Sequence, residues 1–296
     1  MSIYENNLPD VILDTDTYNE IDDQFALSLL LKSGHRLNTK AIYAAPFFNQ
    51  KSTGPEDGME KSYDEILKLL GLLGRESKSS LVFKGSRRYL PDEKTPVDSP
   101  AARDLSVRAM DYSPEKPLFV AAIGAITNIA SAILLNPDIS DRIRVIWLGG
   151  HARFFPDTKE FNMFQDIAAA RVVMTHANLV QLPCNGVVSE FRISKPELEH
   201  WLIKKNPLAD YLANNVIEEA ESYASGTAWT RVIWDVTAVA YLLNDNDRYM
   251  RSVRLPVVLP DYSGHYEKEP IGREMTYVYR IERDRLMTDL IRVLTD

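Results

Sequence analysis

VILDTDTYNEIDDQFALSLLLK (residues 11–32) is the stretch that decides the fold. It opens with a short apolar run, Val11 to Leu13, that is typical of a buried strand. From Asp22 to Lys32 the apolar side chains recur at helical spacing, which predicts an amphipathic helix. Acidic side chains crowd the loop between the two: Asp14, Asp16, Glu20, Asp22 and Asp23. The stretch therefore predicts a strand that ends in an acidic loop and continues into a helix.

The same alternation of strand and helix continues along the chain. Short apolar runs predict strands at residues 40–44, 81–83, 118–123, 145–148, 179–182 and 276–281. Helical spacing predicts helices at residues 59–73, 101–110, 126–135, 166–175, 236–243 and 284–294. This alternation predicts a single α/β Rossmann-like domain over residues 1–296, with a mainly parallel central sheet flanked by helices. We also expect a helical insertion around residues 195–232, with its helical pattern running from Lys195 to Glu221.

Composition limits the possible partners. The chain has 296 residues and a formal net charge of -8, so a nucleic-acid polymer, whose phosphates repel an acidic surface, is not expected to bind. No apolar run reaches the length of a membrane span, and the opening MSIYENNLPD lacks the pattern of a signal peptide. The single cysteine, Cys184, excludes an intramolecular disulfide and a cysteine-rich metal site. We therefore expect a cytoplasmic protein whose ligand is a small molecule or a metal ion.

The acidic loop follows the first predicted strand, at the edge of the sheet where α/β proteins bind ligands. Helix capping accounts for one or two aspartates at such a place, but not for four. A bound divalent cation accounts for more, and an all-oxygen set of ligands favours Ca²⁺ or Mg²⁺. An EF-hand is excluded because Asn19 occupies the position where its loop needs a glycine.

A second interpretation of the loop is a metal-dependent phosphatase of the haloacid dehalogenase type. The run Asp14-Thr15-Asp16-Thr17 imitates the D-x-D-x-T/V motif of that class, in which the first aspartate is the nucleophile. Such a phosphatase also needs a later lysine and an acidic pair after another strand. WLGGHARF (147–154) offers neither, although the sequence leaves this alternative open.

Four further motifs follow the acidic loop along the chain. They are AIYAAPFFN (41–49), VAAIGAITNIASAILLNP (120–137), WLGGHARFFPDTKEFNMFQDIAAARVV (147–173) and WDVTAVAYLL (234–243). Together with the loop, they resemble in order and spacing the inosine–uridine preferring nucleoside hydrolase family, whose signature is D-x-D-P-G-x-D-D-A-x-A-L. The resemblance covers Val11 to about Leu243. It implies Ca²⁺-dependent hydrolysis of the N-glycosidic bond of a ribonucleoside or related ribosyl compound by a homodimer or homotetramer.

The resemblance also implies a role for individual residues. Four are implied to bind Ca²⁺: Asp16, Asp23, Asp235 and, through its backbone carbonyl, Thr127. Four are implied to bind the sugar: Asp22, Asn49, Glu160 and Asn162. Asp16 is in addition implied to be the general base, which takes a proton from a Ca²⁺-bound water, while Asp14 supports the loop. These residue types suit the reaction, because carboxylates stabilise the positive charge that develops on the sugar.

The chain departs from the family pattern at three places. Its loop at Thr17–Glu20 is two residues longer than the family's Pro-Gly, so Asn19 and Glu20 are candidates to reach the site. Trp234 replaces the histidine that serves many members as the leaving-group acid, and an indole N–H cannot protonate a base. The segment 150–160 is short and lacks the asparagine that usually contacts the 5′-hydroxyl.

These departures leave the aglycone open. We expect an atypical nucleoside or ribosyl compound that stacks on Trp234, with Trp229 and Tyr223 as further stacking candidates. Tyr223, Arg231 and His151 are unranked candidates for the acid that protonates the leaving group. A protein that binds a ribosylated metabolite without turnover is a further alternative, beside the phosphatase.

Overall fold

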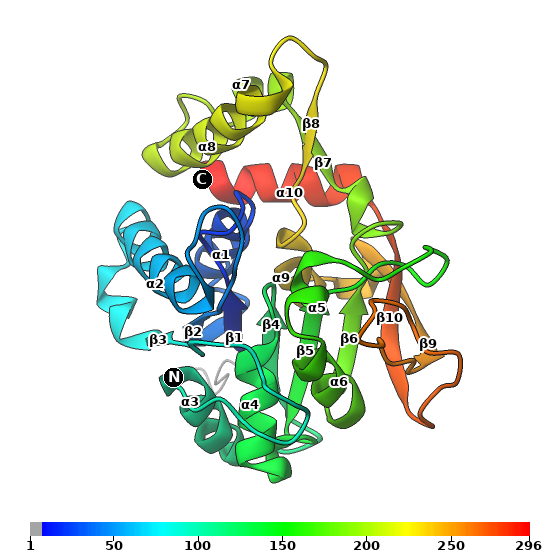
Figure 1. Cartoon of the computed structure of the whole chain (residues 1–296). Coiled ribbons are helices and arrows are strands. Elements are labelled where there is room, and N and C mark those ends of the chain that lie inside the picture. Colours follow the sequence, from blue (N-terminus) through cyan, green and yellow to red (C-terminus); the bar gives the residue numbers. More distant parts are fainter. Residues whose placement is uncertain (1–7) are drawn as a thin grey trace.

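An eight-stranded sheet forms the centre of the computed structural model, which describes residues 8–296 (Figure 1). The strand order is β3-β2-β1-β4-β5-β6-β10-β9, and all neighbours are parallel except β10 and β9. The predicted α/β fold with a mainly parallel sheet is therefore confirmed. The strands are β1 (Asp10–Thr15), β2 (Asn38–Ala44), β3 (Val82–Lys84), β4 (Leu118–Ala122), β5 (Ile143–Leu148), β6 (Asn178–Leu182), β9 (Met250–Pro256) and β10 (Glu274–Ile281).

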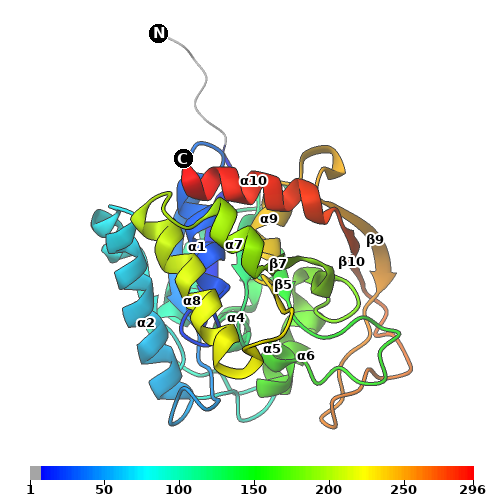
Figure 2. The same ribbon diagram turned by 90° about the horizontal axis from the view of Figure 1, so that it is seen from above.

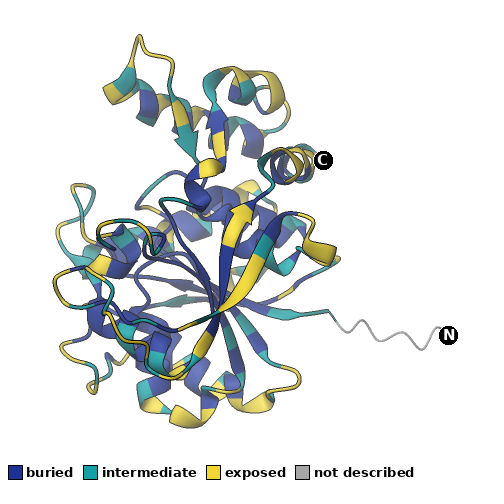
Figure 3. Cartoon of the chain, turned by 90° about the vertical axis from the view of Figure 1, so that its right-hand side faces the viewer, coloured by how far each residue is buried: buried dark blue, intermediate teal, exposed yellow. Residues whose placement is uncertain are grey.

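Helices cover both faces of this sheet. One core, which includes Val11 and Leu13, lies under α1, α2, α9 and α10, and a second, which includes Ile12, lies under α3, α4 and α6. Alternate residues of β1 thus serve opposite cores, which is why its apolar run is uninterrupted. Figure 3 shows buried residues gathered along the central strands. The helices are α1 (Asp23–Lys32), α2 (Pro55–Leu72), α3 (Pro100–Arg108), α4 (Thr127–Leu135), α5 (Phe161–Gln165), α6 (Ile167–His176), α9 (Val236–Leu242) and α10 (Arg283–Thr295).

The insertion expected around residues 195–232 contains two helices and one strand of a small hairpin. The second helix starts afresh because Asn206 caps it and Pro207 occupies its first turn. The helical pattern expected from Lys195 to Glu221 is thus divided between two helices, and the last residues of the insertion form β8, which pairs antiparallel with β7. In Figure 2 α8 lies between α2 and α7, and it packs on both and on α10. The elements are β7 (Arg192–Ser194), α7 (Lys195–Trp201), α8 (Pro207–Ala224) and β8 (Thr230–Val232).

Residues 1–7 lie outside the described part of the chain, and with them most of the segment on which the absence of a signal peptide was predicted. Within residues 8–296, none of the helices combines the length and the apolar character needed to cross a membrane.

The connections from β1 and β4 lead across the sheet in opposite directions. β1 is followed by β2 and β3 on one side, whereas β4 is followed by β5 and β6 on the other. In sheets of this kind a ligand crevice opens beyond the carboxyl ends of the two strands where the order reverses. The acidic loop after Thr15 and the turn after Ala122 meet at this switch point.

Candidate active site

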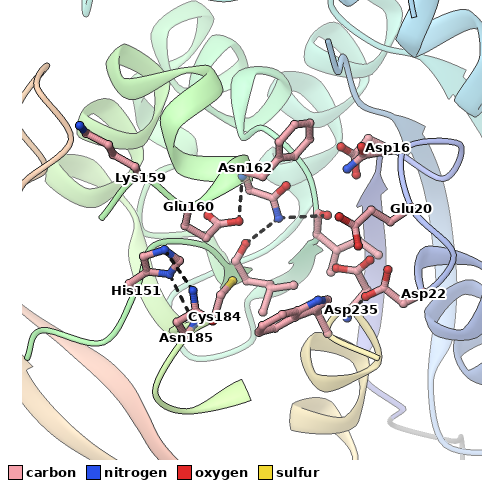
Figure 4. Close-up of a pocket in the computed structure, with 15 residues that line it drawn as sticks. Asp16, Glu20, Asp22, His151, Lys159, Glu160, Asn162, Cys184, Asn185 and Asp235 are labelled. Carbon is pink, nitrogen blue, oxygen red and sulfur yellow. Dashed lines mark hydrogen bonds between the residues drawn. The ribbon is translucent and has the colours of Figure 1, made fainter. Parts of the chain in front are cut away.

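A pocket of about 270 Å³ lies at the switch point, beyond the carboxyl ends of β1, β4, β5 and β6. Figure 4 shows two walls that face each other across it. The acidic wall carries Asp16, Glu20, Asp22 and Asp235. The far wall carries His151, Lys159, Glu160, Asn162, Cys184 and Asn185. Apolar surface comes from Ile123, Leu148, Phe161 and Trp234.

Asp16 is buried, and neither of its carboxylate oxygens has a hydrogen-bond partner among residues 8–296. Its backbone carbonyl accepts a hydrogen bond from the N–H of Asn19 at 2.7 Å, which tightens the turn after β1. Gly124 leaves room for it, because a Cβ atom there would lie 3.1 Å from the Asp16 carboxyl carbon. Burial, reinforced by the charge of Asp23, raises the pKa of Asp16 well above its usual value. A buried carboxylate without partners is costly, so this position fits a bound cation.

Three further aspartates bring their carboxylates together beside it. One oxygen from each of Asp22, Asp23 and Asp235 lies within 4.8 Å of the others. The Thr15 hydroxyl donates to Asp23 at 2.5 Å, and the backbone N–H of Asp235 donates to Asp22 at 3.2 Å. Burial raises the pKa of Asp23 to about 6, because a negative charge is costly in the protein interior. Oxygen ligands alone suit Ca²⁺ or Mg²⁺ better than a softer metal.

Two of the four implied Ca²⁺ ligands belong to this cluster of aspartates. Asp23 and Asp235 lie in the cluster, together with Asp22, which the resemblance assigns to the sugar. Asp16 lines the same pocket, but in the described chain it is not part of that mutually close set of oxygens. Thr127 opens α4, and its hydroxyl donates at 2.6 Å to the carboxylate that caps α6. A metal-binding role for its backbone carbonyl stays a prediction.

Glu160 and Asn162 lie on the far wall, where the backbone holds them. Glu160 caps α5, and its carboxylate accepts hydrogen bonds from the N–H groups of Gly150, Asn162 and Met163 at 2.8, 2.8 and 3.0 Å. The Asn162 amide nitrogen donates to the carbonyl oxygens just past β4 and at the end of β5, at 3.3 and 3.0 Å. Glu160 therefore holds the start of α5, and Asn162 joins the ends of β4 and β5.

Asn49 lies behind the described pocket wall, next to Asn19. It is not among the described residues that line the pocket. Its side chain donates to Asn19 at 2.6 Å and accepts from the backbone N–H of Lys51 at 2.8 Å. Asn19 does line the pocket, as its place in the longer loop suggested. Asn49 therefore positions Asn19, and direct contact with the sugar stays a prediction.

The aromatic side chains expected to stack on the aglycone are dispersed. Trp234 lines the pocket, whereas Trp229 and Tyr223 are not among its described lining residues. The Trp229 indole donates to Glu221 at 3.1 Å, and the Tyr223 hydroxyl accepts from Arg231 at 2.6 Å. Trp234 is therefore the one of the three that is placed to meet an aglycone within the described pocket.

Of the three candidates for a leaving-group acid, His151 is the one on the described pocket wall. It lies on the far wall beside Asn185, whose amide nitrogens approach its ring at 3.3 and 3.4 Å. Burial lowers the pKa of His151, which favours its neutral form. Arg231 instead pairs with Glu219 at 2.9 Å and with Glu20 at 3.5 Å.

Three residues of the far wall were not predicted to belong to the site: Lys159, Cys184 and Asn185. Cys184 and Asn185 follow the end of β6, so their signal was a place just beyond a predicted parallel strand. Cys184 is buried, and this burial raises the pKa of its thiol well above the usual value. The thiol is therefore uncharged and contributes a small polarisable surface.

Asp14 supports the loop from inside the protein. It is fully buried, and the side-chain amide of Asn128 donates to it at 2.8 Å. The oxygen of the same amide accepts from the backbone N–H of Ser86 at 2.7 Å. Burial raises the pKa of Asp14 to about 7, and the hydrogen bond from Asn128 opposes this rise. Asn128, in the first turn of α4, thus ties the end of β1 to the segment just after β3 beneath the pocket.

Replacing Asn128 by Ala is expected to lower the free energy of unfolding by about 2 kcal/mol, because a buried carboxyl and a buried N–H lose their partner. With a raised pKa, folded Asp14 retains a proton that the unfolded chain loses above about pH 4, so its contribution falls as the pH rises through about 7. The loss in the variant should be larger at about pH 8 than at about pH 5.5. Urea unfolding at both pH values measures this, and Asp14→Asn should remove the difference.

Fold and pocket together define a doubly wound α/β protein with a carboxylate-lined ligand site at its switch point. Residues 11–286 match the sequence model of the inosine-uridine preferring nucleoside hydrolases, and the chain belongs to this family.

Individual relatives agree with this assignment. The chain is 33% identical over 96 residues to an inosine-uridine preferring nucleoside hydrolase of Leishmania major, a match that covers 31% of each protein. It is 27% identical over 183 residues to one of Crithidia fasciculata, covering 58% of this chain and 56% of the relative. The chain thus spans about a third to about half the length of these curated relatives. Among solved structures, a plant nucleoside hydrolase shares the fold with a TM-score of 0.77 at 20% identity, over 97% of this chain and 99% of its own.

Family membership confirms the resemblance seen in the sequence. It also withdraws support from the phosphatase interpretation. Asp14, the nucleophile in that interpretation, is buried beside Asn128 and is not among the described residues that line the pocket.

Proposed function

We propose that the protein hydrolyses the N-glycosidic bond of a ribonucleoside or related ribosyl compound with the help of bound Ca²⁺. The observation that carries the proposal is the carboxylate of Asp16, buried at the pocket with both oxygens free of partners in the described chain. A general base and metal ligand needs free oxygens of this kind. Membership of the nucleoside hydrolase family supports the same reaction.

The acidic cluster is the proposed Ca²⁺ site. Asp23, Asp235 and Asp16 would hold the ion, with the backbone carbonyl of Thr127 as a further oxygen ligand. The raised pKa values of the three carboxyl groups come first from burial, so each gains from a neighbouring cation. When bound, Ca²⁺ supplies positive charge that holds the ribose hydroxyls and makes a nearby water more acidic.

The side chains of the pocket have separate proposed roles in proton transfer, sugar binding and contact with the aglycone. Asp16 accepts the proton of the water that attacks the anomeric carbon. Asp22 accepts hydrogen bonds from ribose hydroxyls, and Asn162, whose amide nitrogen is used by two carbonyls, offers its oxygen to the sugar. The acidic wall stabilises the positive charge that the sugar acquires as the bond to the aglycone breaks. Trp234 supplies apolar surface beside the aglycone.

Release of free ribose tests the proposal. Purine, pyrimidine and modified nucleosides are incubated with the purified protein, in Ca²⁺ and in chelator, and reducing sugar is measured. We expect release from at least one compound in Ca²⁺, and a loss of that release in chelator. Calcium binding without release from any nucleoside would favour the alternative of a ribosyl-binding protein. Equal release in chelator would contradict the metal-dependent form of the proposal.

The quaternary state and location remain predictions of the resemblance and of the composition. We propose a homodimer or homotetramer in the cytoplasm, which binds neither nucleic-acid polymers nor membranes. Light scattering of the purified protein coupled to size-exclusion chromatography measures the mass, and a mass near 33.6 kDa, that of one chain, would contradict the oligomer.

A further inference from the structure

We infer that the substrate carries a positively charged aglycone, of the N-ribosyl pyridinium class, that leaves as a neutral base. This inference rests on the proposed function and names the substrate of the same site. Two features of the pocket lead to it: Trp234 stands where the family has its histidine, and carboxylates outnumber basic side chains in the lining that Trp234 shares.

The first feature concerns the leaving group. An uncharged nucleoside releases its base as an anion unless an acid protonates it. Trp234 stands where the family has its histidine, and an indole N–H does not transfer its proton to a leaving base. Tyr223 and Arg231 are bound to each other, and neither is among the described residues that line the pocket. His151 lies on the far wall next to Asn185, across from the acidic wall (Figure 4).

A pyridinium aglycone removes the need for an acid. Its ring nitrogen carries a positive charge while it is bonded to the anomeric carbon. When that bond breaks, the electron pair goes to the nitrogen, and the aglycone leaves as a neutral pyridine. Water forms the new bond to the anomeric carbon, and its proton goes to Asp16 and then to solvent. The products are ribose, the neutral pyridine and one proton, so charge and atoms balance without protonation of the leaving group.

The second feature is the charge of the acidic wall. Asp16, Glu20, Asp22 and Asp235 all line it, and a divalent cation would offset only two negative charges. Glu20 adds a carboxylate from the longer loop, at 42% exposure of its side chain. It is 3.5 Å from Arg231, which makes a shorter contact of 2.9 Å with Glu219. Glu20 is therefore only partly neutralised by its neighbour and can attract a cation in the pocket.

Trp234 and the acidic wall together form a pair of groups that recognises a flat cation. An indole face attracts a cation through its quadrupole, and nearby carboxylates add direct attraction. Lys159 is the basic side chain of the described pocket lining, and in Figure 4 its amine points away from the acidic wall. It therefore leaves the negative potential at the acidic wall in place.

Two ligands that differ in charge but not in shape test the inference. N-ribosyl-3-carbamoylpyridinium is positively charged, and its reduced 1,4-dihydropyridine form is neutral. Ribose release from both, and from uridine and inosine, is measured in Ca²⁺ as kcat/KM. We expect the pyridinium compound to exceed each neutral compound by about 100-fold or more, as electrostatic complementarity and the lost need for an acid act together.

Glu20→Gln is the variant that tests the charge, and Glu219→Gln is its matched control. Both remove one negative charge beside Arg231, but in the described chain only Glu20 lines the pocket. Glu20→Gln should reduce the advantage of the pyridinium compound about tenfold, mainly through KM, while Glu219→Gln should leave the advantage unchanged. Release from uridine or inosine that equals or exceeds release from the pyridinium compound would overturn the inference but not the proposed function. No release from any of the four compounds would overturn the inference, and it would contradict the proposed function as well if the wider nucleoside panel also released no ribose.

Discussion

Asp16→Asn is expected to lower kcat for ribose release about a thousandfold, which lies within the usual range for the loss of a general base. The amide has almost the same shape as the carboxylate, so the pocket keeps its form. It has no negative charge and cannot take up the proton of the attacking water. The assay uses a substrate that the wild type cleaves, with Ca²⁺ raised to saturation for each protein, so that weaker metal binding is separated from slower chemistry.

Asp14→Asn is the matched control for this experiment. Asp14 is two residues away and equally buried, but it is bonded to Asn128 beneath the pocket. We expect its kcat to stay within about threefold of the wild type, since surrounding structure rather than chemistry changes. If Asp14→Asn abolishes turnover and Asp16→Asn does not, the assignment of the base is wrong. If Asp16→Asn raises KM and leaves kcat unchanged, Asp16 binds the substrate or the metal and is not the general base.

The parallel strands could be predicted because strands that are buried on both faces have apolar residues at consecutive positions in the sequence. β9 lacks that run: it lies at the edge of the sheet, and its central residues, 252–254, are exposed. Hydrophobic periodicity also cannot be recognised in very short elements. This applies to the strands β7 and β8 and to the five-residue helix α5. β7 and β8 depend on a contact between distant segments, because they pair with each other across the insertion. The carboxylate of Glu160, which caps α5, is also fixed by the N–H of Gly150.

The acidic wall of the site could be predicted for a similar reason. Its residues follow the first strand directly, or belong to a motif with a fixed spacing. The partners of other side chains depend on how separate segments pack against each other. The spacing of residues in the sequence does not reveal this packing. Asn49 turned out to bind Asn19, and Trp229 turned out to bind Glu221 of α8. Trp229 and Trp234 are close in sequence, yet β8 lies between them and only Trp234 lines the described pocket.

Removal of Ca²⁺ is expected to abolish ribose release and to lower the melting temperature by an amount that grows with pH. The reason is the pKa of the acidic cluster. Burial raises the pKa of Asp16, Asp22 and Asp235 well above the usual value, and that of Asp23 to about 6. In the unfolded chain these groups titrate near about pH 4. The folded, metal-free protein therefore binds more protons than the unfolded chain, and its stability falls as the pH rises from about 4 through the raised pKa values.

Bound Ca²⁺ reverses this trend, because it binds the deprotonated carboxylates and must compete with protons at low pH. At a concentration of about 100 times its Kd it should add about 2.7 kcal/mol to the free energy of unfolding, or about 5 °C in melting temperature. We expect that shift at about pH 8 and a much smaller one at about pH 5, measured by thermal melts in Ca²⁺ and in chelator. Asp23→Asn should lose most of the shift at both pH values, since it removes a proposed ligand. A shift of the same size at both pH values, or one that survives in Asp23→Asn, would place the stabilising ion outside the acidic cluster.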